Sequence, residues 1–148
     1  MKTLVQNKKV KFNYEILETL KPGIELLGIE VKTLRGGQGS LEGSHITIRG
    51  NEAYLVGAVI PPYQPQNTPS GYEDARVRRL LLTKKEIAIL NGFESHKGLT
   101  IVPLSVYSTG RHLKVSIAVV RGKKKYDKRE TIKKRQDERE MGRSLKNK

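Results

Sequence analysis

Hydrophobic and polar residues alternate along several short segments of this chain, the pattern of strands with one buried face. In residues 12–19, Phe12, Tyr14 and Ile16 alternate with polar side chains, which predicts a half-buried strand. A turn at Lys21-Pro22-Gly23 should lead into a second strand over residues 24–28 and close a hairpin. Further strands are predicted over 45–49, 53–60, 100–107 and 112–120, with turns at Gly50-Asn51 and Ser108-Thr109-Gly110.

Two segments have helical spacing instead. Val31, Leu34 and Arg35 recur at i, i+3 and i+4, so residues 30–35 should form a short helix that the following glycines end. A second helix is predicted over 80–93, with Ile87 and Leu90 on its buried stripe and a stop at Asn91-Gly92. Thr83 and Glu86 have the spacing of a capping box in this second helix.

The predicted elements are about six strands and two helices, joined by glycine turns and by a proline-rich loop over 61–74. Many short antiparallel strands with few helices are typical of small β folds. We therefore expect a mainly β, OB-like closed antiparallel barrel with two or three short helices and a basic C-terminal tail.

The charge distribution divides the chain. The net charge is +14, and residues 121–148 hold 13 of the 29 lysines and arginines but only 5 of the 15 acidic residues. Few apolar side chains occur there, so we expect a barrel over 1–120 and a tail over 121–148 that is disordered when free. Such basicity indicates a polyanionic partner, most often nucleic acid.

Several classes of chemistry are not favoured by the composition. The chain has no cysteine, and its three histidines lack the spacing of metal ligands. We expect no cofactor, no metal and no enzymatic activity. The N-terminal residues do not resemble a signal peptide and no apolar run approaches a membrane span, so a soluble cytoplasmic protein is expected, with no membrane partner.

Basic residues of the predicted barrel occur in groups that could contact phosphates. The groups are Lys8, Lys9 and Lys11; Lys32 and Arg35; Arg76, Arg78 and Arg79; Lys84 and Lys85. Tyr63 and Tyr72 flank the proline-rich loop and could stack on bases, whereas core packing is the favoured interpretation for Tyr14. In a helical tail, Lys128, Ile132, Arg135, Arg139 and Arg143 would share one face, and a phosphate surface would relieve the repulsion between these arginines.

Five stretches, in order, resemble one family. They are Asn7-Lys8-Lys9, GIEVKTLRGG (28–37), RRLLLTKKEI (78–87), GLTIVPLSVY (98–107) and GKKKYDKRE (122–130). They resemble the SsrA-binding protein (small protein B) family. The resemblance implies an OB-type barrel that binds the tRNA-like domain of transfer-messenger RNA and delivers it to stalled ribosomes for trans-translation. It also implies a tail that turns helical in the ribosomal mRNA channel, near the decoding centre and 16S rRNA; a monomer is expected.

The resemblance also assigns residues. The RNA-binding set is Asn7, Lys8, Lys9, Glu30, Lys32, Arg35, Arg78, Arg79 and Lys84. The ribosome-facing set is Gly122, Lys123, Lys124, Tyr126, Asp127, Lys128, Arg129, Lys134, Arg135 and Arg139. For Glu30, a structural salt bridge to a nearby Lys or Arg is an equal alternative to an RNA contact. The chain departs from the family pattern at Thr83, where a histidine is usual, at Gly71-Tyr72-Glu73-Asp74, and at Lys125.

Two other functions stay open. One is a ribosomal or general RNA-chaperone OB-fold protein, which would show no preference for a tRNA-like RNA. The other is a metal-dependent nuclease using Glu18, Glu30 or Glu86.

Overall fold

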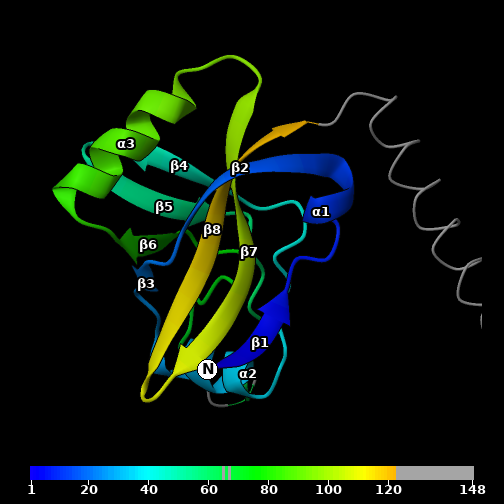
Figure 1. Cartoon of the computed structure of the whole chain (residues 1–148). Helices are drawn as coiled ribbons and strands as arrows, with labels where there is room; N and C mark the ends of the chain where they lie inside the picture. Colours follow the sequence, from blue (N-terminus) through cyan, green and yellow to red (C-terminus); the bar gives the residue numbers. More distant parts are fainter. Residues whose placement is uncertain (65, 67, 123–148) are drawn as a thin grey trace, which may run out of the picture.

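The computed structural model describes residues 1–64, 66 and 68–122. Eight strands and three helices follow one another along this part of the chain (Figure 1). They are β1 (Lys2–Gln6), α1 (Val10–Asn13), β2 (Tyr14–Leu20), β3 (Gly23–Ile24), α2 (Gly28–Arg35), β4 (His45–Arg49), β5 (Glu52–Val56), β6 (Arg78–Leu81), α3 (Lys84–Glu94), β7 (Leu99–Thr109) and β8 (His112–Gly122). The predicted tail, apart from its first two residues, lies outside the described residues.

All strands belong to one antiparallel sheet, which confirms the predicted mainly β class. The strand order is β1-β7-β8-β3-β6-β5-β4, and β2 also pairs with β8. This path leaves β1 and β4 at its ends, and no pairing joins them in the described part of the chain, so closure into a barrel is not confirmed.

The β7–β8 hairpin is the centre of the sheet. Both strands run for eleven residues: β7 extends past both of its predicted ends, and β8 begins at the predicted residue and extends past its predicted C-terminal end. Pro103 lies inside β7, which is paired on both sides. Proline has no backbone N–H and cannot donate a hydrogen bond to a neighbouring strand. The register of β7 against β8 shifts between Pro103 and Ser105, and strands tolerate proline at such irregularities.

The predicted hairpin of residues 12–28 is wrong. Phe12 and Asn13 belong to α1, and β2 pairs with β8 instead of with β3. Beyond Pro22 the chain continues along β8, where Gly23 lies opposite Lys114, and then moves over to β6. Most of β2 is exposed, including Ile16 and Leu17, and only Leu20 at its end packs against the main core.

The β4–β5 hairpin confirms the predicted turn. Gly50 and Asn51 both have positive φ, at 56° and 63°, as a two-residue turn of the type common in hairpins requires. The prediction that β5 reaches residue 60 is wrong, because the strand ends at Val56. Gly57 comes next with φ 89°, a conformation that breaks the strand and that L side chains avoid.

The helices agree with the sequence pattern but have shifted ends. The predicted short helix is confirmed as α2, which begins two residues earlier. The second predicted helix begins too early: Leu80 and Leu81 belong to β6, and the helix starts after Thr83. It also passes the predicted stop at Asn91-Gly92 and ends at Glu94, because Phe93 packs against the core from the last turn.

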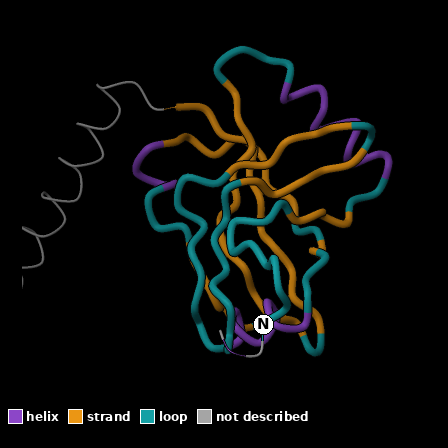
Figure 2. Tube along the Cα trace, turned by 180° about the vertical axis from the view of Figure 1, so that it is seen from behind, coloured by secondary structure: helices purple, strands orange, loops and turns teal. Residues whose placement is uncertain are grey.

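The core has two parts. The larger cluster fills the space between the curved sheet and α2 and α3, with Leu34 and Leu90 as helix contributions. A smaller cluster of Val10, Val102, Ala118 and Val120 lies under α1. Seen from behind, long loops run over the sheet (Figure 2), and one is attached by the bridge between Ser40 and Val59.

The capping box of α3 is confirmed and gives a prediction. The Thr83 hydroxyl accepts from the Glu86 amide, and the Glu86 carboxylate accepts from the Thr83 amide at 3.0 Å. Thr83→Ala should destabilise the fold by about 1 kcal/mol in urea unfolding, because the helix loses a cap. Thr83→Ser keeps the acceptor and should cost little; equal losses in the two variants would contradict the capping role.

Candidate nucleic-acid interface

Glu30 and Arg78, two members of the predicted RNA-binding set, form an ion pair with no exposed surface. Arg78 donates from Nε and Nη2 to Glu30 Oε2, at 2.9 and 2.6 Å. Arg78 also donates to the backbone oxygens of Ala58 and Asp74, at 2.7 and 2.9 Å. The guanidinium thus joins α2, the segment after β5 and the end of the 61–74 loop to β6.

The second oxygen of Glu30 is also occupied. Oε1 accepts from the Leu27 amide at 2.8 Å and from Arg76 Nη2 at 2.5 Å. Burial by itself raises the pKa of Glu30, but the hydrogen bonds from Arg76, Leu27 and Arg78 outweigh it, so its pKa lies below the ordinary value. The carboxylate is therefore held ionised within a closed set of donors.

Tyr72 completes this network. Its hydroxyl lies 2.8 Å from the Ile60 oxygen and 3.2 Å from Glu30 Oε2. Burial and the charge of Glu30 raise the pKa of Tyr72. Tyr72 stands in one of the segments that depart from the family pattern, and the structure places its hydroxyl in contact with Glu30, so its role here includes fixing the loop.

The expected RNA contacts of Glu30 and Arg78 need correction. Side chains without exposed surface cannot reach a nucleic acid unless the fold opens. Of the two alternatives for Glu30, the structural salt bridge is the one found. The sequence around this glutamate gave no local sign of burial, because its arginine partners lie 46 and 48 residues away.

The Asn7-Lys8-Lys9 segment comes after β1 and leads into α1. The Asn7 amide donates to the backbone oxygens of Pro103 and Leu41, at 3.1 and 3.4 Å, so it ties β1 to two neighbouring segments. Lys8 is exposed. Lys9 donates to Glu42 at 2.5 Å, which raises the pKa of Lys9. Sequence reasoning missed Glu42, because it stands 33 residues away with no distinguishing motif.

The other basic residues lie on separate faces. Lys32 and Arg35 are exposed on α2, where Arg35 donates to the Arg111 oxygen in the β7–β8 turn. Lys84 is exposed at the start of α3, a helix that lies well apart from α2 (Figure 1). The structure therefore does not bring the predicted RNA-binding residues into a single patch.

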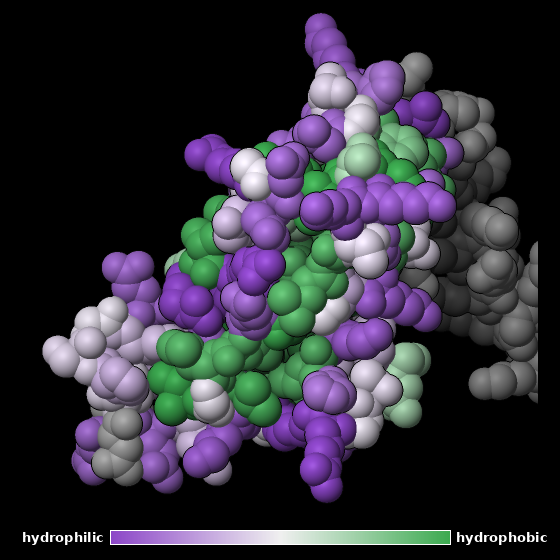
Figure 3. All heavy atoms as spheres, turned by 90° about the vertical axis from the view of Figure 1, so that its left-hand side faces the viewer, coloured by the Kyte–Doolittle hydropathy of each residue, from purple (hydrophilic) through white to green (hydrophobic). Residues whose placement is uncertain are grey.

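Arg79 is paired with two carboxylates. It donates to Glu52 and to Glu25, at 2.9 and 2.8 Å, and the bond to Glu52 is the main reason that its pKa is raised. Figure 3 shows the side of the molecule that carries α3 and β6, where hydrophilic side chains surround hydrophobic ones. Leu81 and Ile89 are the large exposed hydrophobic residues of these two elements. A ligand on this face would meet apolar surface beside the paired charge of Arg79.

Of the ribosome-facing set, the structure describes Gly122 alone. This glycine is the last residue of β8 and lies opposite Tyr14 in β2. The remaining members lie outside the described residues: Lys123, Lys124, Tyr126, Asp127, Lys128, Arg129, Lys134, Arg135 and Arg139.

The three glutamates considered as nuclease residues do not form a common site. Glu86 caps α3, Glu30 belongs to the buried network, and Glu18 is exposed on β2. Within residues 1–64, 66 and 68–122, no three histidine or carboxylate side chains are placed to share a metal ion. None of the helices there is long and apolar enough to cross a membrane.

Comparison with known proteins gives matches along nearly the whole chain. The family described as SmpB protein matches residues 4–147. The SsrA-binding protein of Microcystis aeruginosa is 43% identical over 146 residues, 99% of this chain and 95% of the relative. That of Gloeothece citriformis is 46% identical over 145 residues, 98% and 94% of the two chains. A chain from the solved structure "tmRNA-SmpB: a journey to the center of the bacterial ribosome" is 40% identical, with a TM-score of 0.69, over 81% of this chain and 84% of that one.

The buried ion pair gives a prediction on stability. Glu30→Gln should lower the free energy of unfolding by about 3 kcal/mol, because it leaves the buried charge of Arg78 without its counter-ion. Urea unfolding at neutral pH measures this loss. Glu25→Gln breaks an exposed pair with Arg79 and serves as the matched control, with a far smaller effect expected. If both variants lost similar free energies of unfolding, the Glu30–Arg78 pair would contribute no more to stability than an exposed ion pair.

The same two proteins test the direction of the Glu30 pKa. A carboxylate with a lowered pKa in the folded state stabilises the fold above its ordinary pKa, and this contribution is lost as the pH falls. The difference in unfolding free energy between the wild type and Glu30→Gln should therefore be full at neutral pH and shrink in acid. If the difference in unfolding free energy grew in acid, the pKa of Glu30 would be raised by folding and not lowered.

Proposed function

This chain belongs to the SmpB protein family, and from that premise we propose that it is an RNA-binding adaptor of trans-translation. It binds the tRNA-like domain of transfer-messenger RNA and delivers that RNA to stalled ribosomes, so that the nascent chain is tagged and released. The observation that carries this proposal is the match over residues 4–147, which includes both the sheet and the basic tail. The names of the relatives and of the solved ribosome structure support the two partners.

We propose a division of labour between the sheet and the tail. The folded part binds RNA through exposed cations, of which Lys8, Lys32 and Lys84 form no ion pair within the described part of the chain. The residues from Gly122 onward serve the ribosome, at the decoding centre, 16S rRNA and mRNA channel. Strand β8 continues to Gly122, two residues past the predicted boundary, so we propose that Gly122 is the point where the two parts join.

We propose an OB-type barrel as the architecture and the cytoplasm as the place of action. The sheet bends so far that β4 packs against β7, a strand near its other end. Such curvature brings opposite parts of a sheet together across one core, as in partly open OB barrels. Cytoplasm is where stalled ribosomes occur.

We also propose that the protein acts without catalysis. Glu30 and Glu86, two of the three candidate nuclease residues, already have their carboxylates engaged in the network and in the α3 cap. The remaining alternative, a general RNA-chaperone protein, differs in preference: it would bind bulk tRNA and transfer-messenger RNA equally. Competition between these two RNAs for the full chain separates the proposals.

Removal of residues 123–148 tests the division of labour. The truncated chain keeps every described element, so its affinity for the tRNA-like domain should stay within about threefold of the wild type, while tagging on stalled ribosomes is lost. Filter binding measures the affinity, and a reconstituted translation assay on mRNA without a stop codon measures tagging. An unchanged thermal melt is the control for folding. An affinity loss as severe as the tagging loss would refute the division.

The variant Lys32→Gln tests whether contacts with phosphates contribute to RNA affinity. Each phosphate contact that is removed should lower the slope of log affinity against log salt by about one. Lys32→Gln should show this change, because Lys32 is exposed and its charge is not neutralised by a neighbour within the described residues. Arg79→Gln should alter the slope less, since Arg79 is already paired with Glu25 and Glu52. Equal salt slopes for the wild type and Lys32→Gln would show that Lys32 does not contact a phosphate of the RNA.

A further inference from the structure

Strand β2 has an edge without a partner. Among the described strands it pairs with β8 alone, and five of its seven residues are exposed. Ile16 and Leu17 belong to the large hydrophobic residues at the surface, with exposed fractions of 36% and 44%. A free strand edge with apolar side chains readily takes up another chain segment, and proteins usually cover or blunt such an edge. The outer side of β2 is therefore a candidate docking face, and its charges indicate what would dock there.

A register shift in β2 places two carboxylates on one face of the strand. Glu15 lies opposite Arg121 in β8. Glu18 lies opposite Val119, and the register shifts between these two pairs. Because Val119 and Arg121 are two residues apart, their side chains and those of the glutamates opposite them point to the same face. Without the extra residue, Leu17, the two glutamates would point to opposite faces.

The two carboxylates differ in their partners. Glu15 forms an ion pair with Arg121, the residue before the end of β8. Glu18 is exposed and forms no ion pair within the described part of the chain. This face of β2 thus holds one cation already and has a free carboxylate beside it.

The chain itself supplies further cations from a nearby point. Beyond Gly122, which lies opposite Tyr14, residues 123–148 hold 12 lysines and arginines and 5 acidic residues. Glu18 lies opposite Val119, three residues before Gly122, so the segment must turn back by about 10 Å to reach it. An extended chain advances by about 3.3 Å per residue, so a turn and a few more residues are enough.

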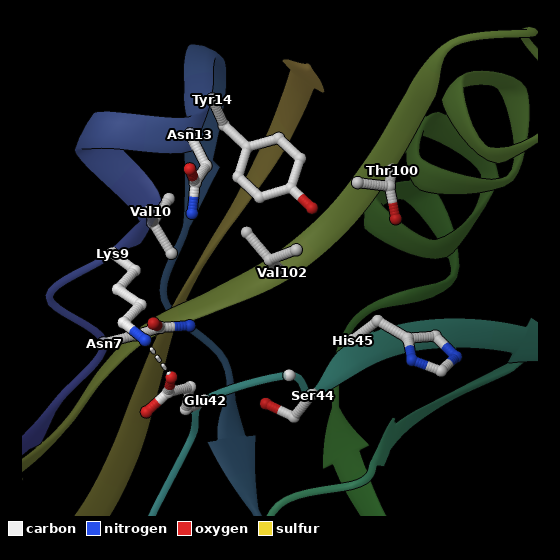
Figure 4. A pocket seen from close by; sticks show the side chains of 11 residues that line it. Asn7, Lys9, Val10, Asn13, Tyr14, Glu42, Ser44, His45, Thr100 and Val102 are labelled. Atoms are coloured by element: carbon white, nitrogen blue, oxygen red, sulfur yellow. Dashed lines mark hydrogen bonds and ion pairs between the residues drawn. The ribbon is translucent and has the colours of Figure 1, made fainter. Parts of the chain in front are cut away.

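The cavity beside α1 does not suit a basic segment. It has a volume of about 430 Å³, and its lining includes Tyr14, Lys9 and Glu42 (Figure 4). The Lys9 ammonium already occupies the Glu42 carboxylate, at 2.5 Å. A lysine or arginine would meet a like charge there, whereas β2 offers a free carboxylate.

We propose that, in the absence of RNA, residues 123–148 fold back onto the exposed edge of β2, with their cations at Glu18 and their apolar side chains on Ile16 and Leu17. The apolar side chains of this segment are Tyr126, Ile132, Met141 and Leu145. Exposed ion pairs are weak and screened by salt, so several cations can occupy the same place in turn. The contact covers the free edge of β2 and needs no single conformation of the segment.

The role of this contact in rescue rests on the function proposed above. An RNA backbone presents a row of phosphates, whereas β2 presents one free carboxylate. Ribosomal RNA therefore displaces the segment from β2, while a weaker or smaller anion does not. The contact keeps the basic segment close to the sheet until a large polyanion is present.

A spin label on the full chain tests the contact. The chain has no cysteine, so Gln136→Cys gives a single site for a nitroxide label within the segment. In NMR spectra without RNA, the label should weaken the amide signals of residues 15–19 far more than that of Gly110, beyond the other end of β8 from Gly122 (Figure 1). In 1 M salt, where the screening length falls to about 3 Å, most of this difference should be lost. Equal weakening at both places in low salt would overturn the proposal.

Two charge reversals in the labelled chain test Glu18 as the acceptor. Glu18→Lys should restore most of the lost signal, because it replaces the free carboxylate with a cation. Glu73→Lys is the matched control: Glu73 is also exposed and forms no ion pair within the described residues, so the β2 signals should stay weak. If Glu18→Lys folds and its β2 signals stay weak, the proposal is wrong. The salt series uses the natural β2 and decides the matter if this variant does not fold.

A mixture of two chains separates contact within one molecule from contact between two. A spin-labelled chain without isotope enrichment is mixed with an isotope-enriched chain without spin label. The β2 signals should remain strong in this mixture; if they weaken as in the singly labelled chain, the segment docks on a second copy and the proposal is wrong. No RNA is present in these measurements, so their failure leaves the proposed adaptor function intact.

Discussion

The buried pairing of Glu30 with Arg78 is the interaction on which the arrangement of this molecule depends. Helix α2 contributes one charge and strand β6 the other, and the loop between residues 60 and 74 is fastened to both. Taking two charges out of water is costly, and the cost is offset only when every lone pair and proton finds a partner. Here both carboxylate oxygens have donors, while Arg76 Nε has no partner among the described residues. The exposed cations of α2 thus project from a helix with a fixed position.

Local chemistry was predictable wherever a few adjacent residues decide the conformation. The Gly50-Asn51 turn and the Thr83 cap depend on residues within one turn of the chain, and both were found as expected. The predictions failed where pairing between strands that are distant in the sequence decides the conformation. Leu80 and Leu81 share helical spacing with the residues of α3, but β3 and β5 on either side recruit them into a strand. The residues after Pro22 looked like the return strand of a hairpin, yet β2 has a longer partner in β8, and β3 pairs with β6.

The same distinction applies to the site. The family resemblance assigned RNA contacts to Glu30 and Arg78, with a structural salt bridge as an equal alternative for Glu30. No pattern in the sequence reveals that these two residues pair with each other in the core, because charged residues are normally exposed. Lys9 is exposed, as an RNA contact requires, but its partner Glu42 comes from a loop far along the chain, which the sequence did not reveal. Tyr14 shows the limit most clearly: alternation marks it as an inward-facing residue, whereas only the folded chain shows a hollow beside its ring.

The pairing of Gly122 with Tyr14 has a consequence for how two large partners are joined. The chain beyond residue 122 starts from a point fixed by the register of β8, opposite the first residue of β2. A ligand held by the folded part and a second one held by the C-terminal residues would therefore meet at an effective concentration set by this attachment point, without any contact between them. Weak individual affinities would then suffice for a complex that forms only when both ligands are present.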